Sequence, residues 1–97
     1  MTAYISLLNF TEQGLHTIKE TVNRVHATEK MFETMGVRKI GVWWTVGQYD
    51  LVLIIEAPDD QTASRALIQF AMAGNVRTAS MRAFSEDEMQ TLVSGLK

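Results

Sequence analysis

Apolar positions recur along the chain with two periods, one typical of strands and one typical of helices. Residues 3–10 are apolar at both alternating sets of positions, which predicts a strand buried on both faces. Apolar residues at helical spacing then predict a long helix over about 12–35, with Gly36 placed as a left-handed C-terminal cap. Gly14 interrupts the helical pattern, so we expect the first turn to be irregular or separate.

The middle of the chain predicts two strands joined by a tight turn. Residues 38–46 form the second expected strand, and residues 49–56 form a third that is again apolar on both faces. Gly47 and Gln48 between them fit a two-residue structural turn, since positive φ costs glycine nothing in the first central position.

The C-terminal third predicts a helix, a strand and a short last helix. An aspartate after Pro58 serves as the N-cap of a helix that Gly74 closes. Residues 75–84 predict strand four, and Ser85 with Glu88 forms a capping box that begins the last helix.

This order of elements predicts an α+β fold of the ferredoxin-like type. The plan is β-α-β-β-α-β plus a C-terminal helix, with a four-stranded antiparallel sheet whose central strands are the first and third. Those two strands are the ones with apolar residues on both faces. The main helices cover one face, so the other face would expose a large apolar area. We therefore predict a homodimer, or a higher homo-oligomer, packed sheet face to sheet face.

Composition narrows the class of protein further. Ninety-seven residues predict one domain over 1–97, and a formal charge of −2 favours neither nucleic acid nor membrane as a partner. The absence of cysteine excludes disulfides and thiolate metal sites, and it suits a reducing cytoplasm. The N-terminus lacks a signal-peptide pattern, and no apolar run approaches the roughly 20 residues of a membrane span. We expect a soluble, unprocessed cytoplasmic protein without a cofactor.

Asp50 is the most distinctive candidate site residue, because aspartate is disfavoured in strands and five apolar residues follow this one. Three interpretations stay open: a cap of the turn, a partner of an arginine, or a carboxylate base whose pKa is raised by burial. Tyr49 either packs its ring at the sheet edge or presents its hydroxyl to a ligand. Arg77 either neutralises Asp50 or holds a substrate carboxylate with its planar fork of donors.

Three further residues complete the candidate set. Asn75 brings a polar group to the start of strand four. Trp43 and Trp44 must point in opposite directions, so we expect one in the core and the other at a pocket or interface. Trp44 is the one that we take as a candidate ligand-binding residue. His16 is either an acid–base group or a surface histidine. It lies ten positions from His26, roughly 15 Å along a helix, so the two cannot share a metal and no metal site is expected.

The segment Gly47-Gln48-Tyr49-Asp50 resembles the glycine-tyrosine-aspartate motif that gives the GYD domain family its name. This family consists of small bacterial and archaeal proteins without an established activity. The resemblance implies a dimeric α+β barrel, and structural relatives of that kind include cofactor-independent oxygenases, isomerases and amino-acid-sensing regulatory domains. Other segments that resemble the GYD family are spread over almost the whole chain: Tyr4 to Thr11 with Gly14, Glu56-Ala57-Pro58-Asp59, Gly74-Asn75-Val76-Arg77-Thr78, and Ala83-Phe84.

These observations lead to three functional hypotheses. The first is a small dimeric ligand-binding or regulatory module with an apolar pocket between sheet and helices, closed by Tyr49, Asp50, Arg77 and a tryptophan. The second is a cofactor-independent enzyme for a small apolar or aromatic compound, with Asp50 as base or His16 as acid–base group. The third is a structural oligomerisation unit. The many apolar lining positions and the few acids and bases favour the first.

Overall fold

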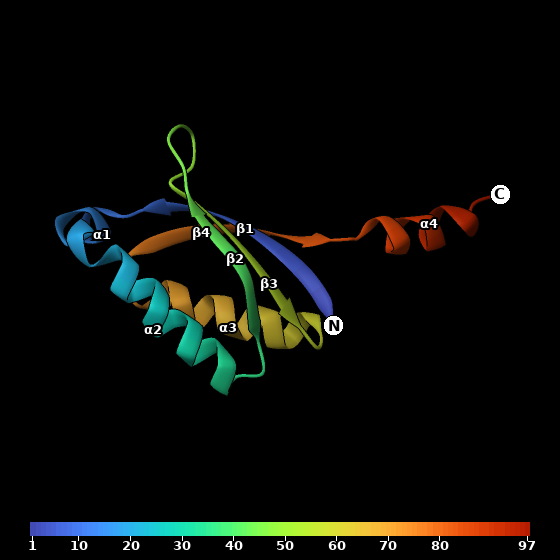
Figure 1. Cartoon of the computed structure of the whole chain (residues 1–97), viewed down its shortest axis with the longest axis horizontal. Coiled ribbons are helices and arrows are strands. Elements are labelled where there is room, and N and C mark those ends of the chain that lie inside the picture. Colours follow the sequence, from blue (N-terminus) through green and yellow to red (C-terminus); the bar gives the residue numbers. More distant parts are fainter.

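A computed structural model describes residues 1–97, and it consists of one antiparallel sheet with helices packed on one face (Figure 1). None of the helices has the length and apolar character that a membrane span requires. The elements in chain order are β1 (Thr2–Phe10), α1 (Glu12–His16), a 3₁₀ turn η1 (Ile18–Glu20), α2 (Thr21–Thr34), β2 (Arg38–Trp44), β3 (Leu51–Ala57), α3 (Asp60–Met72), β4 (Val76–Ala83) and α4 (Glu86–Ser94).

The sheet has the strand order β2-β3-β1-β4, so β1 and β3 are central. Both pair antiparallel with their neighbours, and Ile5 of β1 lies between Ile54 of β3 and Met81 of β4. This arrangement confirms the predicted ferredoxin-like topology. The two segments with the most continuous apolar sequence are thus the two central strands, as expected.

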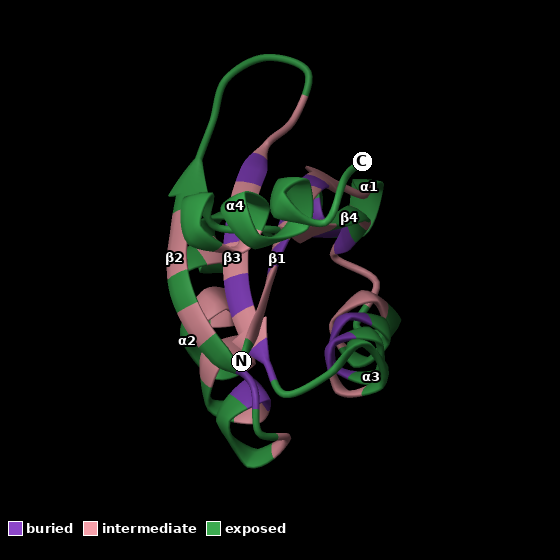
Figure 2. Cartoon of the chain, turned by 90° about the vertical axis from the view of Figure 1, so that its right-hand side faces the viewer, coloured by how far each residue is buried: buried purple, intermediate pink, exposed green.

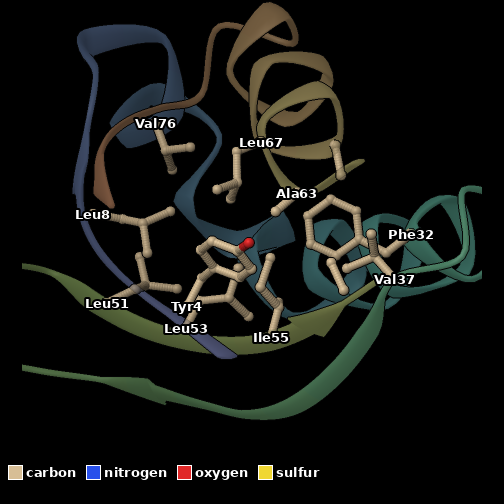
Figure 3. Close-up of a cluster of buried hydrophobic side chains, with 12 residues drawn as sticks. Tyr4, Leu8, Phe32, Val37, Leu51, Leu53, Ile55, Ala63, Leu67 and Val76 are labelled. Carbon is tan, nitrogen blue, oxygen red and sulfur yellow. The ribbon is translucent and has the colours of Figure 1, made fainter. Parts of the chain in front are cut away.

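The core lies between the sheet and the helices α2 and α3 (Figure 3). One alternating set of strand positions points into it, including Leu8 of β1 and Ile55 of β3, which are 1% and 0% exposed. Phe32 of α2 meets Phe70 of α3 edge to face at 6.0 Å, which joins the two helices above the sheet. The opposite set of strand positions forms a second face, which we call the open face, and no element of the chain covers it. The larger apolar residues of the open face are Ile5, Leu7, Trp43, Val52, Ile54 and Met81.

The predicted long helix is divided, as Gly14 suggested. Glu12–His16 forms a short helix, a 3₁₀ turn follows, and α2 begins only at Thr21. The division allows α1 to pack on the start of β4, where the backbone N–H of Thr11 donates to the carbonyl of Asn75 at 3.1 Å. The helix ends where expected, with Gly36 at a φ of 80°.

The turn between β2 and β3 is wider than the sequence predicted. The strands end at Trp44 and begin again at Leu51, so Gly47 and Gln48 are part of a longer loop rather than a two-residue turn. The backbone N–H of Thr45 donates to the carbonyl of Asp50 at 2.8 Å and closes this loop at its base. Gly47 has a φ of 141°, a conformation that residues with a side chain rarely adopt. The loop projects away from the helix layer (Figure 1).

Strand β2 contains an irregularity that the alternating pattern did not predict. Its register against β3 shifts between Lys39 and Gly41, which leaves Ile40 exposed. Such a bulge adds one residue to the strand, so the strict alternation of side chains between the two faces of the sheet is broken at this point. The indole of Trp43 lies over Gly41, where a β-carbon would stand 2.5 Å from the ring.

Helix α4 extends beyond the end of β4, away from the body of the chain (Figure 1). It is largely exposed (Figure 2), and its apolar residues include Leu92 at 48% exposure, with Leu96 just beyond its end at 76%. The polar contact that ties it to the sheet is between Arg82 and Glu88, with 3.4 Å between guanidinium and carboxylate. The predicted capping box is present at Ser85 and Glu88.

Candidate functional site

An apolar cavity of about 170 Å³ lies between α2, α3 and one end of the sheet. Its walls come from Phe10, Val76 and Leu51 on the strands and from Val25 and Phe70 on the two helices. A smaller hollow continues from it toward Phe32 and shares Val25, Leu51 and Phe70 with it. The gap exists because α2 carries small residues where larger ones would fill it. These small residues are Ala27 and Thr28.

Half-buried polar side chains line part of the cavity, and we call the part lined by Thr21, Arg24 and Asn75 its mouth. The guanidinium of Arg24 donates to the carbonyl of Thr17 at 2.7 Å and to the carbonyl of Gly14 at 3.2 Å. These contacts hold the arginine against the divided helix, so the break after α1 is what positions its charge at the mouth.

The far end of the hollow is closed by an ion pair. The ammonium of Lys39 on β2 lies 2.8 Å from the carboxylate of Glu29 on α2. Both side chains line the hollow, and each neutralises the charge of the other there. Arg24 has no such carboxylate partner among the ion pairs of the chain.

Two of the five predicted ligand-binding residues lie at this cavity. Asn75 lines it directly, and its side-chain carbonyl accepts a hydrogen bond from Gln13 at 3.1 Å. Trp44 lies beside the mouth, where its indole N–H donates to the hydroxyl of Thr21 at 3.0 Å. The two tryptophans face opposite ways as expected, with Trp43 on the open face. The expectation that one of them lies in the core is wrong, because Trp43 and Trp44 are 54% and 42% exposed.

Asp50 and Tyr49 lie in the loop before β3 and do not line the cavity. The carboxylate of Asp50 accepts a hydrogen bond from the backbone N–H of Phe10 at 2.9 Å, while its own N–H donates to Leu8 at 2.8 Å. The side chain thus continues the pairing of β3 with β1 past the end of the strand. This cap of a neighbouring strand is an interpretation that differs from all three we drew from the sequence.

Arg77 lies on the open face, opposite Asn9 of β1, and not on the face of the cavity. The ion pairs of the chain do not include a contact between Arg77 and Asp50, so the interpretation in which Arg77 neutralises Asp50 is wrong. Strand β1 separates the two side chains in the sheet, which the sequence alone could not reveal.

His16 is on the exposed surface of α1, 3.8 Å from the carboxylate of Glu12 one turn earlier. It does not line the cavity. Neither histidine belongs to a group of three ligand side chains that could hold a metal ion.

Arg24 and Thr21 are functional candidates that the sequence reasoning missed. Both fall at polar positions of an amphipathic segment, where solvated side chains are the ordinary expectation. A signal was nevertheless present, because Gly14 marks the break that brings the backbone of Thr17 to Arg24.

A second polar group lies at the opposite end of β1. The hydroxyl of Tyr4 donates to the carboxylate of Asp60 at the start of α3. Burial, followed by this hydrogen bond to a carboxylate, raises the pKa of the Tyr4 phenol. The guanidinium of Arg82 lies over the rings of Phe84 and Tyr4, at 4.3 Å and 5.9 Å, and links this group to the base of α4.

The sheet order, with two helices on one face and a cavity beneath them, defines a small α+β domain of the ferredoxin-like class. The chain belongs to the GYD domain family, whose model matches residues 4–93. A relative from Thermus thermophilus, named glutamine synthetase and cystathionine beta-lyase binding protein, is 31% identical over 84 residues, which are 86% of this chain and 88% of the relative. A crystal structure of a protein from Thermus thermophilus has the same fold, with a TM-score of 0.56 and 22% identity over 88% of this chain and 95% of that one.

Proposed function

We propose that this chain is a small homodimeric regulatory module that binds an apolar small molecule between its helices and its sheet. The observation that carries the proposal is the cavity of about 170 Å³ with apolar walls and a polar mouth. Pockets of this composition, with few polar groups at defined positions, are typical of small-molecule sites.

Binding without chemistry accounts for the cavity better than catalysis does. The ionisable groups on its walls are Arg24 and the paired Lys39 and Glu29. A general base must reach the proton that it removes, and both Asp50 and His16 lie outside the cavity. The carboxylate on these walls, Glu29, is engaged by Lys39 at 2.8 Å, and neither of the two groups that the enzyme hypothesis names lines the cavity.

A regulatory role through another protein is supported by the name of the Thermus relative, which describes binding to two enzymes. We propose that this chain likewise acts by binding another protein. We also propose a cytoplasmic location, which suits a protein without cysteine. The ligand in the cavity would then modulate the contact with the partner protein.

The homodimer is supported by the open face of the sheet. Its central strands present the apolar side chains of Ile5, Leu7, Val52 and Ile54, and the edge strands add Trp43 and Met81, which are 54% and 49% exposed. Charged residues lie at its ends, including the Arg38 and Glu56 ion pair and Arg77. An apolar centre with a charged rim is the composition of a protein interface, and a second open face is its simplest complement.

Sedimentation velocity at micromolar concentration tests the homodimer. We expect the wild type at twice the mass of one 10.9 kDa chain, and Met81→Lys at the mass of one chain. Ile68→Lys is the matched control, because Ile68 is 62% exposed on the helix side of the molecule. A monomeric wild type would contradict the proposal.

Thermal shift with a set of small apolar metabolites tests the ligand. The control variant is Ala27→Phe, which places a ring in the cavity from an exposed position of α2. Compounds that stabilise the wild type and not Ala27→Phe support the cavity. Turnover of a bound compound that is lost in Asp50→Asn would instead support the enzyme, and no stabilising compound would favour a purely structural unit.

A further inference from the structure

We propose that the ligand of this cavity is a small carboxylate with one aliphatic or aromatic group, and that Arg24, Thr21 and Asn75 bind its carboxylate. This inference rests on the proposed ligand-binding function and names the chemical class of the ligand. It is carried by three polar side chains that line the same cavity and by the hydrogen bonds that orient them.

Arg24 provides a positive charge that no acid of the chain neutralises. It is half-buried, and its two terminal nitrogens donate to the carbonyls of Thr17 and Gly14 and to the hydroxyl of Thr17. A guanidinium has five N–H donors, so these three bonds leave others for a ligand. A charge fixed in position at the entrance of an apolar space favours an anion there.

Thr21 is oriented so that its hydroxyl can donate. The indole N–H of Trp44 already donates to the Oγ1 of this threonine at 3.0 Å. Because the oxygen is used as an acceptor, the hydrogen of the hydroxyl is free to point to an acceptor on a ligand.

Asn75 is arranged in the same way. The Nε2 of Gln13 donates to the Oδ1 of Asn75 at 3.1 Å, which assigns the carbonyl oxygen to that contact. The amide nitrogen of Asn75 then presents its two N–H donors elsewhere. All three groups at the mouth therefore offer donors, and a carboxylate is a small, planar organic anion that consists only of acceptors.

The size of the cavity limits the apolar part of the ligand. An apolar cavity of roughly 150 Å³ in another protein binds benzene. The cavity here is about 170 Å³, with Phe10, Val25 and Phe70 on its walls, so one ring or a short branched chain fits. A ligand with a second charged group would place that charge among these apolar side chains at a high cost.

Benzoate and benzamide are suitable probes, because they share the ring and differ in charge and in donors. Isothermal titration calorimetry at pH 7 with the wild-type protein measures both dissociation constants. We expect benzoate to bind about tenfold more tightly, since hydrogen bonds to a charged group are roughly twice as strong as neutral ones.

Three variants identify the residues that cause this preference. Arg24→Gln should abolish the preference for benzoate, and Thr21→Val should reduce it several-fold. Arg65→Gln is the charge-matched control, since Arg65 lies exposed on α3 and does not line the cavity, and it should retain the full preference. If Arg24→Gln does not fold, as judged by circular dichroism, the wild type and Thr21→Val still decide the question.

The outcomes separate this inference from the function on which it rests. Equal binding of the two probes, or a preference unchanged in both Arg24→Gln and Thr21→Val, would overturn the carboxylate class and leave the apolar site intact. Binding of neither probe at millimolar concentration would overturn both. A preference that depends on Arg24 and persists in Arg65→Gln supports the inference.

Discussion

The carbonyl oxygen of Asn75 lies 2.1 Å from the position that a β-carbon on Gly14 would occupy. Helix α1 therefore packs on the start of β4 with backbone against backbone, and only glycine fits at the contact. The same contact sets the position of the helix break that holds Arg24 at the mouth of the cavity. Fold and candidate site thus depend on one close approach between two segments far apart in the sequence.

Gly14→Ala should destabilise the protein by about 2 kcal/mol or more, because the overlap must be relieved by moving α1 away from β4. Urea unfolding followed by circular dichroism measures the change. Gly95→Ala is the matched control, since Gly95 has a φ of −84° and its added β-carbon would stand at an ordinary 3.5 Å. Similar stabilities of the two variants would contradict the packing described here.

Asp50→Ala should cost about 1–2 kcal/mol, because the backbone N–H of Phe10 loses a charged acceptor. Asp50→Asn keeps an oxygen at the same position and should cost less. Hydrogen exchange at the Phe10 amide reports the loss directly, with faster exchange expected in Asp50→Ala. Unchanged exchange would show that the carboxylate does not cap β1 in solution.

The Tyr4 phenol makes stability sensitive to alkaline pH. Its pKa in the folded state is raised above the ordinary value of 10.0, first by burial and then by the hydrogen bond to Asp60. The contribution to stability is therefore fully present below pH 10.0 and is lost as the pH rises through the folded-state pKa. Stability measured from neutral to strongly alkaline pH should fall in the wild type and change less in Tyr4→Phe.

The Glu88 carboxylate makes α4 sensitive to acid. The backbone N–H of Ser85, and then Arg82, hold the pKa of Glu88 below its ordinary value of 4.5. The stability that the ionised Glu88 carboxylate contributes to the fold is present above pH 4.5, and it is lost as the pH falls through the pKa of Glu88 in the folded state. Amide protection in α4 should decrease at acid pH in the wild type, and Glu88→Gln should show a weaker dependence. The pKa of Asp59, which caps α3, is also lowered, so acid should weaken α3 as well. The measurement must therefore resolve individual residues to separate the two helices.

Most of the architecture could be predicted from the sequence because local patterns determine it. The continuous apolar runs identify β1 and β3 as central, and Asp59, Ser85 and Gly36 mark helix ends through contacts within a few residues. Such short-range preferences are readable without knowledge of the fold.

The errors concern contacts between distant segments. The loop at Gly47 is longer than predicted because Asp50 closes it six residues wide, against Thr45, while its N–H and carboxylate bond to the backbone of β1. Arg77 was assigned to the cavity, yet strand register places it on the open face. Arg24 was missed because two of its three acceptors are the backbone carbonyls of Gly14 and Thr17, which carry no side-chain signature.

The bulge in β2 limits how copies of this chain can aggregate. Strand β2 is an edge of the sheet, and an uninterrupted edge can add strands from other molecules until a fibril grows. The shift between Lys39 and Gly41 interrupts the regular row of hydrogen-bonding groups, and the ion-paired side chains of Arg38 and Lys39 lie at the same place. Growth along this edge is therefore disfavoured, which leaves association through faces that can close into finite assemblies.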